Sequence, residues 1–404
     1  MEMRKPADFR CEVKTSFDDL DSLRQAWDTA ACELGGSVYM SYDWVRTWWE
    51  FYGGGKQLRV FIFYAGEKIV GLVPIYIDRL GFGPLRFQVA RLVGSNIPPK
   101  VFNPPVDEAW AQQGFRALLS QLFEQDGCDL LSFGPVSELQ KSASILKAVC
   151  QEQEDKVRIL KSEEGVHSVF WLPATMEEYY ESLSKNERKN RRKYELRLLK
   201  KEYDTRVEVL KDPAETSEEF ERFAVQHAGQ WAAEGKTGHF GAWPRALEFN
   251  RALVKAQAKQ GRLRFIRILA NGTVIANQYT FAFGKAYYWE LPSRAIEPQW
   301  ERFSLGPTGI VTMMGAGTEE GITRLEGGLA HYDYKIRLGA KEYTVQTTRA
   351  LANRRSSRLR LLWYNMLKLA MLYGYHKLWY RRITPRLPAV FRTAQWNSWL
   401  RLDF

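Results

Sequence analysis

Two stretches of the chain, LRVFIFYAGEKIVGLVPIY at residues 58–76 and LRFIRILANGTVIANQYTF at residues 263–281, share one pattern at a fixed offset of 205 residues. Each reads as an apolar strand, a short polar turn and a second apolar strand, with the turns AGEK and ANGT in the same place. A helix-like segment precedes each hairpin. Because this period is too long for a solenoid, the sequence predicts two copies of one domain that mixes helices and strands.

The segments after each hairpin extend this pattern. The second hairpin is followed by a third predicted strand, KAYYWEL (285–291), and by a helix that opens at Gly306-Pro307, where proline suits the first helical position. A short strand then leads into RLEGGLAHYDYKIRLGAKEY (324–343). We therefore expect one domain at residues 1–160, a second at 161–348, each with a mixed twisted sheet flanked by helices, and a basic helical tail at 349–404.

Composition narrows the class of protein. With 404 residues and 45% hydrophobic content, the chain can bury two ordinary cores. The four cysteines lie far apart without a CxxC pair, so we expect reduced thiols and no metal site. The beginning of the sequence has no apolar signal-like region, and no window reaches about 18 uncharged apolar residues, so we expect a cytoplasmic protein.

The net charge of +11 belongs to the tail. Residues 349–404 hold 12 Lys or Arg and one Asp, whereas the rest of the chain holds 46 basic and 46 acidic residues. The tail interleaves its basic residues with Leu, Trp and Tyr. Such a pattern suits an interfacial helix on an anionic membrane, or a helix packed on the body with its basic residues outward. RNA binding is a weaker alternative, because no RNA-binding motif accompanies the charge.

The predicted strand KAYYWEL (285–291) and the predicted helix that opens at Gly306 could hold a phosphorylated ligand between them. A strand that leads through a Gly-containing loop to a helix start presents backbone N–H groups and the positive end of a helix dipole, which bind phosphate well. Acyl-CoA carries a pyrophosphate that could bind there. The alternative is an ordinary helix start. Motifs for a P-loop, a GxSxG elbow, HExxH or an EF-hand are absent from the sequence, which disfavours most hydrolases and nucleotidases.

An acidic residue next to two glycines is the main candidate for proton transfer. Glu326 follows a predicted strand and precedes Gly327 and Gly328, and Tyr334 and Lys335 come a few residues later. An acid at a strand end can receive the proton of an amine, and a Tyr-Lys pair can hydrogen-bond a carbonyl or a phosphate. The alternative is a solvated turn at the edge of a sheet.

A segment rich in glycine and aromatic residues could bind the substrate. His227, Trp231 and His239 lie within QHAGQWAAEGKTGHFGAW (226–243), which we expect to be a loop that lines a cleft. The alternative for each histidine is a packed or surface residue, which a lone histidine more often is than a base.

A basic segment is a second candidate. Residues 185–201, predicted to be helical, hold nine Lys or Arg, among them Arg188 and Arg192, against two Glu. The segment could bind phosphates or nucleic acid, or it could be a solvated helix face.

The order of these motifs resembles one family. SLSKNERKNRRKYELRLLK, FAVQHAGQW, ANGTVIANQYTFAF, AYYWEL, FSLGPTGIV and RLEGGLAHYDYK follow one another as in the bacterial CelD-like acetyltransferases, large members of the GNAT superfamily that are related to the FemAB peptidyltransferases. YMSYDWVRTWWEFY and EKIVGLVPIYI extend the resemblance to about residues 20–345. The resemblance implies an α/β fold of tandem GNAT-like acyl-CoA N-acyltransferase lobes, of which the second binds the donor and the first is degenerate.

The resemblance also implies a donor site. The thioester arm would lie along the strand Tyr287–Leu291, and the pyrophosphate would meet the segment Ser304–Gly309. The implied contacts are Tyr288, Trp289, Ser304, Leu305, Gly306, Thr308 and Gly309. Two positions depart from the family, which usually has Ser-Pro-Gly at Ser304-Leu305-Gly306 and Asp at Glu326.

The expected function is transfer of an acyl group, with acetyl-CoA as the donor, to an amine of a sugar or polysaccharide precursor. The amine would attack the thioester directly, with Glu326 as the first candidate base, Glu290 as the second, and Tyr334 to protonate the leaving thiolate or orient the acceptor. Two alternatives remain. One is a FemAB-like transferase that uses aminoacyl-tRNA, and the other is a scaffold without catalytic activity at membrane polysaccharide machinery.

Overall fold

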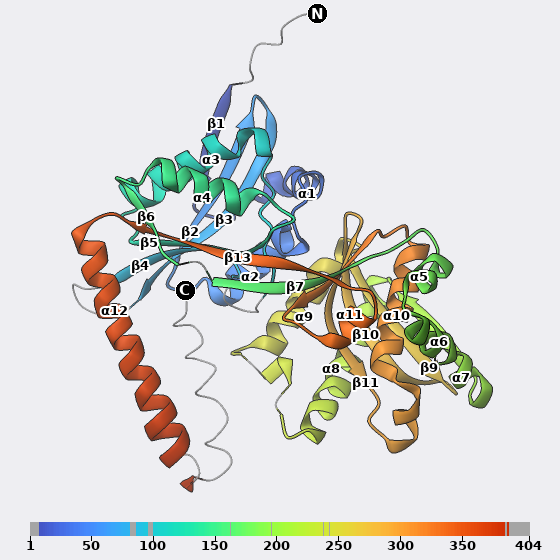
Figure 1. Cartoon of the computed structure of the whole chain (residues 1–404). Helices are drawn as coiled ribbons and strands as arrows, with labels where there is room; N and C mark the ends of the chain where they lie inside the picture. Colours follow the sequence, from blue (N-terminus) through green and yellow to red (C-terminus); the bar gives the residue numbers. More distant parts are fainter. Residues whose placement is uncertain are drawn as a thin grey trace, which may run out of the picture. The chain divides into compact units, whose positions relative to one another are not determined.

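The computed structural model describes residues 8–80, 86–95, 100–161, 163–194, 196–236, 238–241, 243–383 and 386–387. The chain forms two compact units, shown in Figure 1. Unit 1 comprises Met1–Glu164 and Val345–Phe404, and unit 2 comprises Gly165–Thr344. The boundary expected after residue 160 lies four residues before the observed boundary after Glu164. The tail expected at residues 349–404 falls within unit 1.

Unit 1 is an open sheet with helices. Its strands are β1 (Phe9–Lys14), β2 (Gln57–Ala65), β3 (Lys68–Leu80), β4 (Phe87–Leu92), β5 (Leu130–Ser137), β6 (Val157–Ile159) and most of β13 (Lys341–Ala352). Its helices are α1 (Arg24–Glu33), α2 (Tyr42–Tyr52), α3 (Glu108–Ser120), α4 (Ser142–Glu152) and α12 (Arg355–Tyr373), and a π-helical segment, Gly374–Ile383, follows α12.

Unit 2 repeats this plan. Its strands are β7 (Glu163–Trp171), β8 (Thr205–Leu210), β9 (Leu263–Ala270), β10 (Thr273–Phe283), β11 (Ala286–Arg294) and β12 (Arg324–Leu329). Its helices are α5 (Met176–Ser182), α6 (Lys185–Tyr194), α7 (Leu196–Glu202), α8 (Pro213–Ala233), α9 (Ala246–Lys259), α10 (Leu305–Glu319) and α11 (Asp333–Arg337).

The two sheets have the same strand order and the same directions. In unit 1, β1, β2, β3 and β4 are antiparallel neighbours, β4 runs parallel to β5, and β5 is antiparallel to β13. In unit 2, β8, β9, β10 and β11 are antiparallel neighbours, β11 runs parallel to β12, and β12 is antiparallel to β7. The predicted tandem fold is therefore confirmed. The last strand of unit 1 comes from the chain that follows unit 2, a connection that the sequence pattern does not predict.

Both predicted hairpins are present. β2 joins β3 through Gly66 and Glu67, and β9 joins β10 through Asn271 and Gly272. Asn271 and Gly272 have φ angles of 49° and 79°. Two successive residues with positive φ match a type I′ turn, whose twist follows the twist of the flanking strands.

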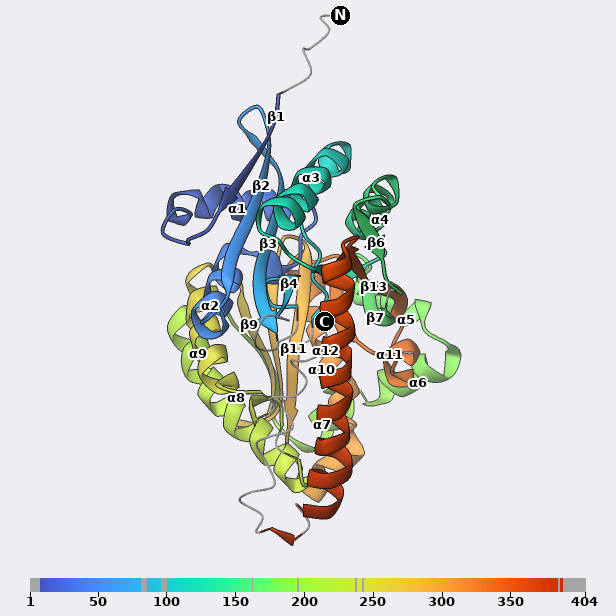
Figure 2. The same ribbon diagram turned by 90° about the vertical axis from the view of Figure 1, so that its left-hand side faces the viewer.

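Helices cover both faces of the sheet in unit 2, as Figure 2 shows. Tyr287 and Leu325 belong to the core that the sheet forms with α10. On the opposite face, Phe265 and Tyr279 pack against Phe223 of α8. Because side chains alternate along a strand, the residues that follow Tyr287 and Leu325 face away from α10.

Two serine or threonine caps start helices within the segment 175–202. The Thr175 and Ser184 hydroxyls accept hydrogen bonds from the backbone N–H groups of Glu178 and Glu187, at 3.2 and 3.3 Å. These caps start α5 and α6. The basic segment is helical as predicted, in α6 and α7, and residue 195 between them lies outside the described residues.

Candidate functional site

The parallel strands β11 and β12 part at the centre of unit 2. They pair at Ala286–Tyr288 with Arg324–Glu326. Beyond Tyr288, β11 continues to Arg294 against β10, whereas beyond Glu326 β12 continues beside β7. The two strand edges that part here could receive a ligand, although the Gly327 and Pro292 carbonyls already accept hydrogen bonds from side chains of the protein.

A β-bulge lies next to the opening. Tyr279 of β10 pairs with Leu291 and the next residue, Thr280, pairs with Trp289, so Glu290 is an extra residue in β11. A bulge leaves its extra residue outside the ladder and redirects the side chains around it. Burial raises the pKa of Tyr279 well above its usual value, and the negative charge of Glu290 adds to the effect. The Glu290 carboxylate therefore lies near Tyr279.

Tyr288 and Trp289 lie at the start of the opening. Tyr288 is buried, and its carbonyl accepts a hydrogen bond from the Thr280 hydroxyl at 2.7 Å. Trp289 is partly buried and packs against the α10 core, and its indole nitrogen has no hydrogen-bond partner among the described residues. An indole N–H in this position can donate to a ligand.

The helix α10 begins one residue earlier than predicted. Leu305 is its first residue, and Ser304 precedes it in a left-handed conformation with φ of 49°. The helix therefore contains Pro307 as its third residue, where the missing N–H also costs nothing. Thr308 strengthens this start, because its N–H donates to the Ser304 carbonyl at 3.0 Å and its hydroxyl donates to the Phe303 carbonyl at 3.1 Å.

The two glycines of this helix start have different surroundings. A Cβ atom at Gly306 would meet nothing within 4 Å, so space adjoins the first turn. A Cβ atom at Gly309 would come within 2.3 Å of Nε2 of Gln278 on β10. Gly309 is therefore needed for close packing of α10 on the sheet, while Gly306 borders the space that a ligand could use.

Glu326 is held by two residues that the sequence analysis missed. Its Oε1 atom lies 3.0 Å from Nε of Arg324, and its Oε2 atom lies 3.3 Å from Nδ1 of His167. Glu326 is 9% exposed and His167 is fully buried. Arg324 is two residues from Glu326 and on the same face of β12. His167 comes from β7, which lies beside β12 through long-range pairing that no local pattern could reveal.

Lys335 supports the backbone that follows Glu326. Its ammonium group donates to the Gly327 carbonyl at 2.7 Å and lies 4.5 Å from the centre of the Tyr332 ring. Lys335 is 3% exposed, and burial lowers its pKa to about 8. Tyr334 is half-buried against the α10 core, and burial raises its pKa to about 12.

The predicted loop at residues 226–243 is wrong for its first part, because His227 and Trp231 lie on α8. The amphipathic spacing of Phe220, Phe223 and His227 on the buried face lets the helix continue. The short 3₁₀ turn His239–Gly241 follows.

The predicted residues His227, Trp231 and His239 do come together. The Nδ1 atom of His227 donates to the Pro292 carbonyl of β11 at 2.9 Å, and its Nε2 atom lies 3.1 Å from Nδ1 of His239. The ring of Trp231 packs edge-on against His239. Burial lowers the pKa of His227, so it is neutral at pH 7 and Nε2 accepts the His239 proton.

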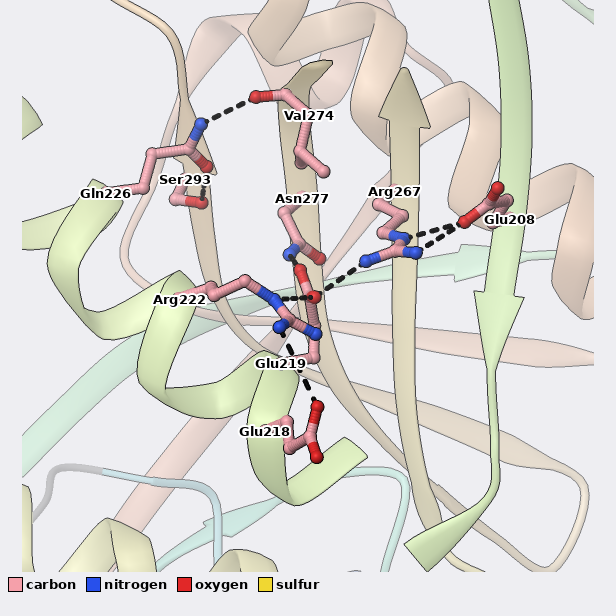
Figure 3. Close-up of polar contacts among 9 residues, drawn as sticks. All are labelled: Glu208, Glu218, Glu219, Arg222, Gln226, Arg267, Val274, Asn277 and Ser293. Carbon is pink, nitrogen blue, oxygen red and sulfur yellow. Dashed lines mark hydrogen bonds and ion pairs between the residues drawn. The ribbon is translucent and has the colours of Figure 1, made fainter. Parts of the chain in front are cut away.

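A buried polar network fixes α8 on the sheet beside these residues (Figure 3). Glu219 is 1% exposed. Its carboxylate accepts hydrogen bonds from Arg222 at 2.9 Å, from Arg267 of β9 at 2.7 Å and from Asn277 of β10 at 2.7 Å. The network therefore positions the helix that carries His227.

Of the two predicted arginines, the structure describes the side chain of Arg188. The Nη2 atom of Arg188 donates to the carbonyls of Glu181 at 2.7 Å and Leu183 at 3.3 Å, so it caps the end of α5. The side chain of Arg192 lies outside the described residues. Lys185, Lys189, Arg197 and Lys200 are exposed.

In unit 1 the equivalent opening is filled by the chain itself. β4 and β5 pair at Val89–Arg91 with Leu130–Ser132. Beyond this point, the Phe102 N–H donates to the Pro135 carbonyl at 2.8 Å, and Oδ1 of Asn103 accepts from the Ser137 N–H at 3.1 Å. Residues 102–103 thus occupy the edge of β5 that corresponds to the open edge in unit 2.

Comparisons with known proteins agree with the fold of unit 2. Residues 185–336, less than half of the chain, match the family model described as Acetyltransferase (GNAT) domain. This part of the chain is therefore a GNAT-type acyltransferase domain. No curated protein matches the chain.

Two solved structures share the fold. FemX aligns with a TM-score of 0.59 and 12% identity, over 80% of this chain and 95% of that chain. A conserved protein of unknown function from Bacteroides thetaiotaomicron aligns with a TM-score of 0.51 and 10% identity, over 85% of this chain and 100% of that chain. The likeness at these identities concerns the fold alone.

Across the ranges that the structure describes, no three His, Cys, Asp or Glu side chains are grouped so as to hold a metal ion. Likewise, no helix in the described part of the chain is long and apolar enough to cross a membrane.

Proposed function

We propose that the chain is an acyl-CoA-dependent N-acyltransferase with acetyl-CoA as its donor. The acceptor is an amine on a sugar or on a polysaccharide precursor of the cell envelope, as the resemblance to the CelD-like acetyltransferases implies. The observation that carries the proposal is the opening between β11 and β12 at Tyr288 and Glu326, beside the bulge at Glu290.

The residues around this opening fit an acyl-CoA donor. The edge of β11 that parts from β12 after Tyr288 can pair with an amide-containing arm, and a bulge next to it provides N–H groups that can polarise a carbonyl. The space beside Gly306 admits a phosphate to the first turn of α10, where N–H groups and the helix dipole favour an anion. The bound thioester supplies the activated acyl group.

Glu326 is the proposed acceptor of the amine proton. Its carboxylate lies at the opening, on the sheet face away from α10, and Arg324 and His167 fix its position. Glu290, in the bulge, is the second candidate. Tyr334 is the proposed hydrogen-bond donor to the leaving thiolate; burial raises its pKa to about 12, so it keeps its proton at neutral pH and is a weaker acid than a free tyrosine. We assign Lys335 to positioning, because its ammonium group holds the Gly327 carbonyl.

The test is release of the CoA thiol from acetyl-CoA in the presence of amino-sugar acceptors. Glu326→Gln should lower kcat at least 100-fold, since a positioned base contributes roughly 10²–10⁴-fold. Glu297→Gln, at an exposed glutamate of the same unit, is the matched control and should leave kcat within twofold. A Glu326→Gln enzyme with kcat within threefold of the wild type would contradict the assignment.

A second candidate is a transferase that uses aminoacyl-tRNA. It is favoured by the exposed lysines and arginine of α6 and α7, which could contact RNA phosphates. Binding of tRNA that weakens steeply with salt, together with no binding of CoA, would favour it. Under the scaffold alternative, variants of Gly306, Glu326 and Lys335 would all retain full biological function. We place the protein in the cytoplasm in each case, at the inner face of the membrane if the tail binds lipid.

A further inference from the structure

The helix α12 has one face fixed on unit 1. The Ser357 hydroxyl donates to Oδ1 of Asp129 at 2.6 Å, and Arg360 lies 3.2 Å from the same carboxylate, which is buried. One turn further on, the buried ring of Tyr364 stacks on Phe87 with a centroid distance of 5.6 Å. The spacing of these anchors, at three and seven residues from the first, places them on one side of the helix.

The opposite face of α12 carries an uninterrupted apolar stripe. It consists of Leu359, Leu362, Met366, Leu369 and Tyr373, which are 55–67% exposed. Their spacing of three and four residues keeps them in one line, and Leu362 and Met366 lie two residues from Tyr364 and so point away from its side of the helix. Five exposed apolar side chains in one continuous stripe indicate a surface that contacts a partner.

Positive charges flank this stripe at both ends. Arg355 and Arg358 are exposed before it, and Lys377, Arg381 and Arg382 are exposed in the π-helical segment after it. No acidic residue occurs in the sequence between Arg349 and Leu402. A partner that matches the stripe must therefore combine an apolar interior with a negatively charged surface.

We propose that α12 docks unit 1 on an anionic lipid bilayer, with the apolar stripe in the interface and the basic residues on lipid phosphates. A preformed helix with these two elements is suited to lie in the plane of the interface. Figure 1 shows α12 as one long helix of unit 1. The docking surface goes beyond the proposed acyl transfer and does not depend on it.

The charges disfavour a second copy as the occupant. The stripe spans just over two heptads, whereas a coiled coil is indicated by three or four heptads with complementary charges beside the seam. The residues beside this seam include Arg358, Asn365 and Ala370, and none is acidic. A second copy would bring only like charge to the contact.

The experiment is flotation of the full chain with vesicles of phosphatidylcholine that contain 30% phosphatidylglycerol, and with vesicles of phosphatidylcholine alone. The stripe variant is Leu362→Gln, Met366→Gln and Leu369→Gln together. The control variant is Leu139→Gln, Val225→Gln and Ile296→Gln, which changes three exposed apolar residues on other surfaces. Thermal unfolding of each variant verifies the fold, and light scattering gives the oligomeric state.

The wild type should bind anionic vesicles at least tenfold better than neutral ones, and less well in 0.5 M salt. The stripe variant should bind anionic vesicles at least tenfold less well than the wild type. The control variant should bind them within twofold of the wild type. No binding by the wild type, or equal losses in both variants, would overturn the proposal. A dimer that the stripe variant dissociates, without vesicle binding, would assign the stripe to a second copy. Vesicle binding that requires residues 388–404, or that appears only after their deletion, would also overturn it.

Discussion

Replacing Glu219 with alanine should loosen the attachment of α8 to the sheet of unit 2. The change leaves the Asn277 amide without its buried acceptor, which costs about 1–3 kcal/mol. It also removes the hydrogen bond between Arg267 and the Glu219 carboxylate, which is worth about 1.5–3 kcal/mol. Arg267 keeps its ion pair with Glu208 at 2.6 Å. The contact with Arg222, whose side chain is 59% exposed, adds at most about 1 kcal/mol. The expected total is about 4 kcal/mol, near the range for breaking a buried ion pair.

Hydrogen exchange of α8 peptides measures this loss locally, which matters because unfolding of a chain with two units need not be two-state. Protection in α8 should fall roughly a thousandfold, since about 1.4 kcal/mol corresponds to a factor of ten. Peptides from β2 and β3 of unit 1 should not change and provide an internal control. Arg222→Ala should cost no more than about 1 kcal/mol. A loss of less than tenfold in the Glu219→Ala variant would refute the reasoning.

Three further predictions concern the same unit. Burial lowers the pKa of Lys335 to about 8 in the folded chain, whereas an unfolded lysine has a pKa of about 10.4. Between about pH 8 and 10.4 the unfolded chain therefore binds more protons than the folded chain. The unfolding free energy should therefore rise by up to about 3 kcal/mol from pH 8 to 10.4 and be flat just below pH 8, and Lys335→Met should abolish this rise in urea titrations. Burial also lowers the pKa of His227, so stability should fall as the pH drops below about 6.5, and His227→Gln should reduce that fall in the same titrations. Gly309→Ala should cost about 1–3 kcal/mol in thermal unfolding because its Cβ meets Gln278, whereas Gly306→Ala should cost nothing.

Local patterns in the sequence predict most of the fold. The hairpins at residues 57–80 and 263–283 follow from alternating apolar residues and turn residues such as Asn271 and Gly272. The capping boxes at Thr175 and Ser184 likewise predict the starts of two helices. The extension of α8 through Trp231 is missed because glycines and histidines suggest a loop, while buried aromatic contacts with the sheet decide in favour of the helix.

The candidate site is less accessible from the sequence, because its geometry depends on pairings between distant segments. Glu326 and Lys335 are recognisable as residues, but the contact of Glu326 with His167 requires the β7–β12 pairing. The bulge at Glu290 depends on the register of β10 and β11, which the sequence does not display. The cap that Arg188 forms on α5 is likewise hidden, because a basic segment does not reveal which of its side chains cap a neighbouring helix.

The most direct test of the proposed donor site is titration calorimetry of the full chain with acetyl-CoA and, separately, with free CoA. Gly306→Glu places a negative charge in the space beside the first turn of α10, and Gly229→Glu is its matched control, because Gly229 is also a helical glycine with open space at its Cβ. We predict one micromolar site per chain that Gly306→Glu abolishes and Gly229→Glu retains. No binding by the wild type, or unchanged binding by Gly306→Glu, would contradict the account.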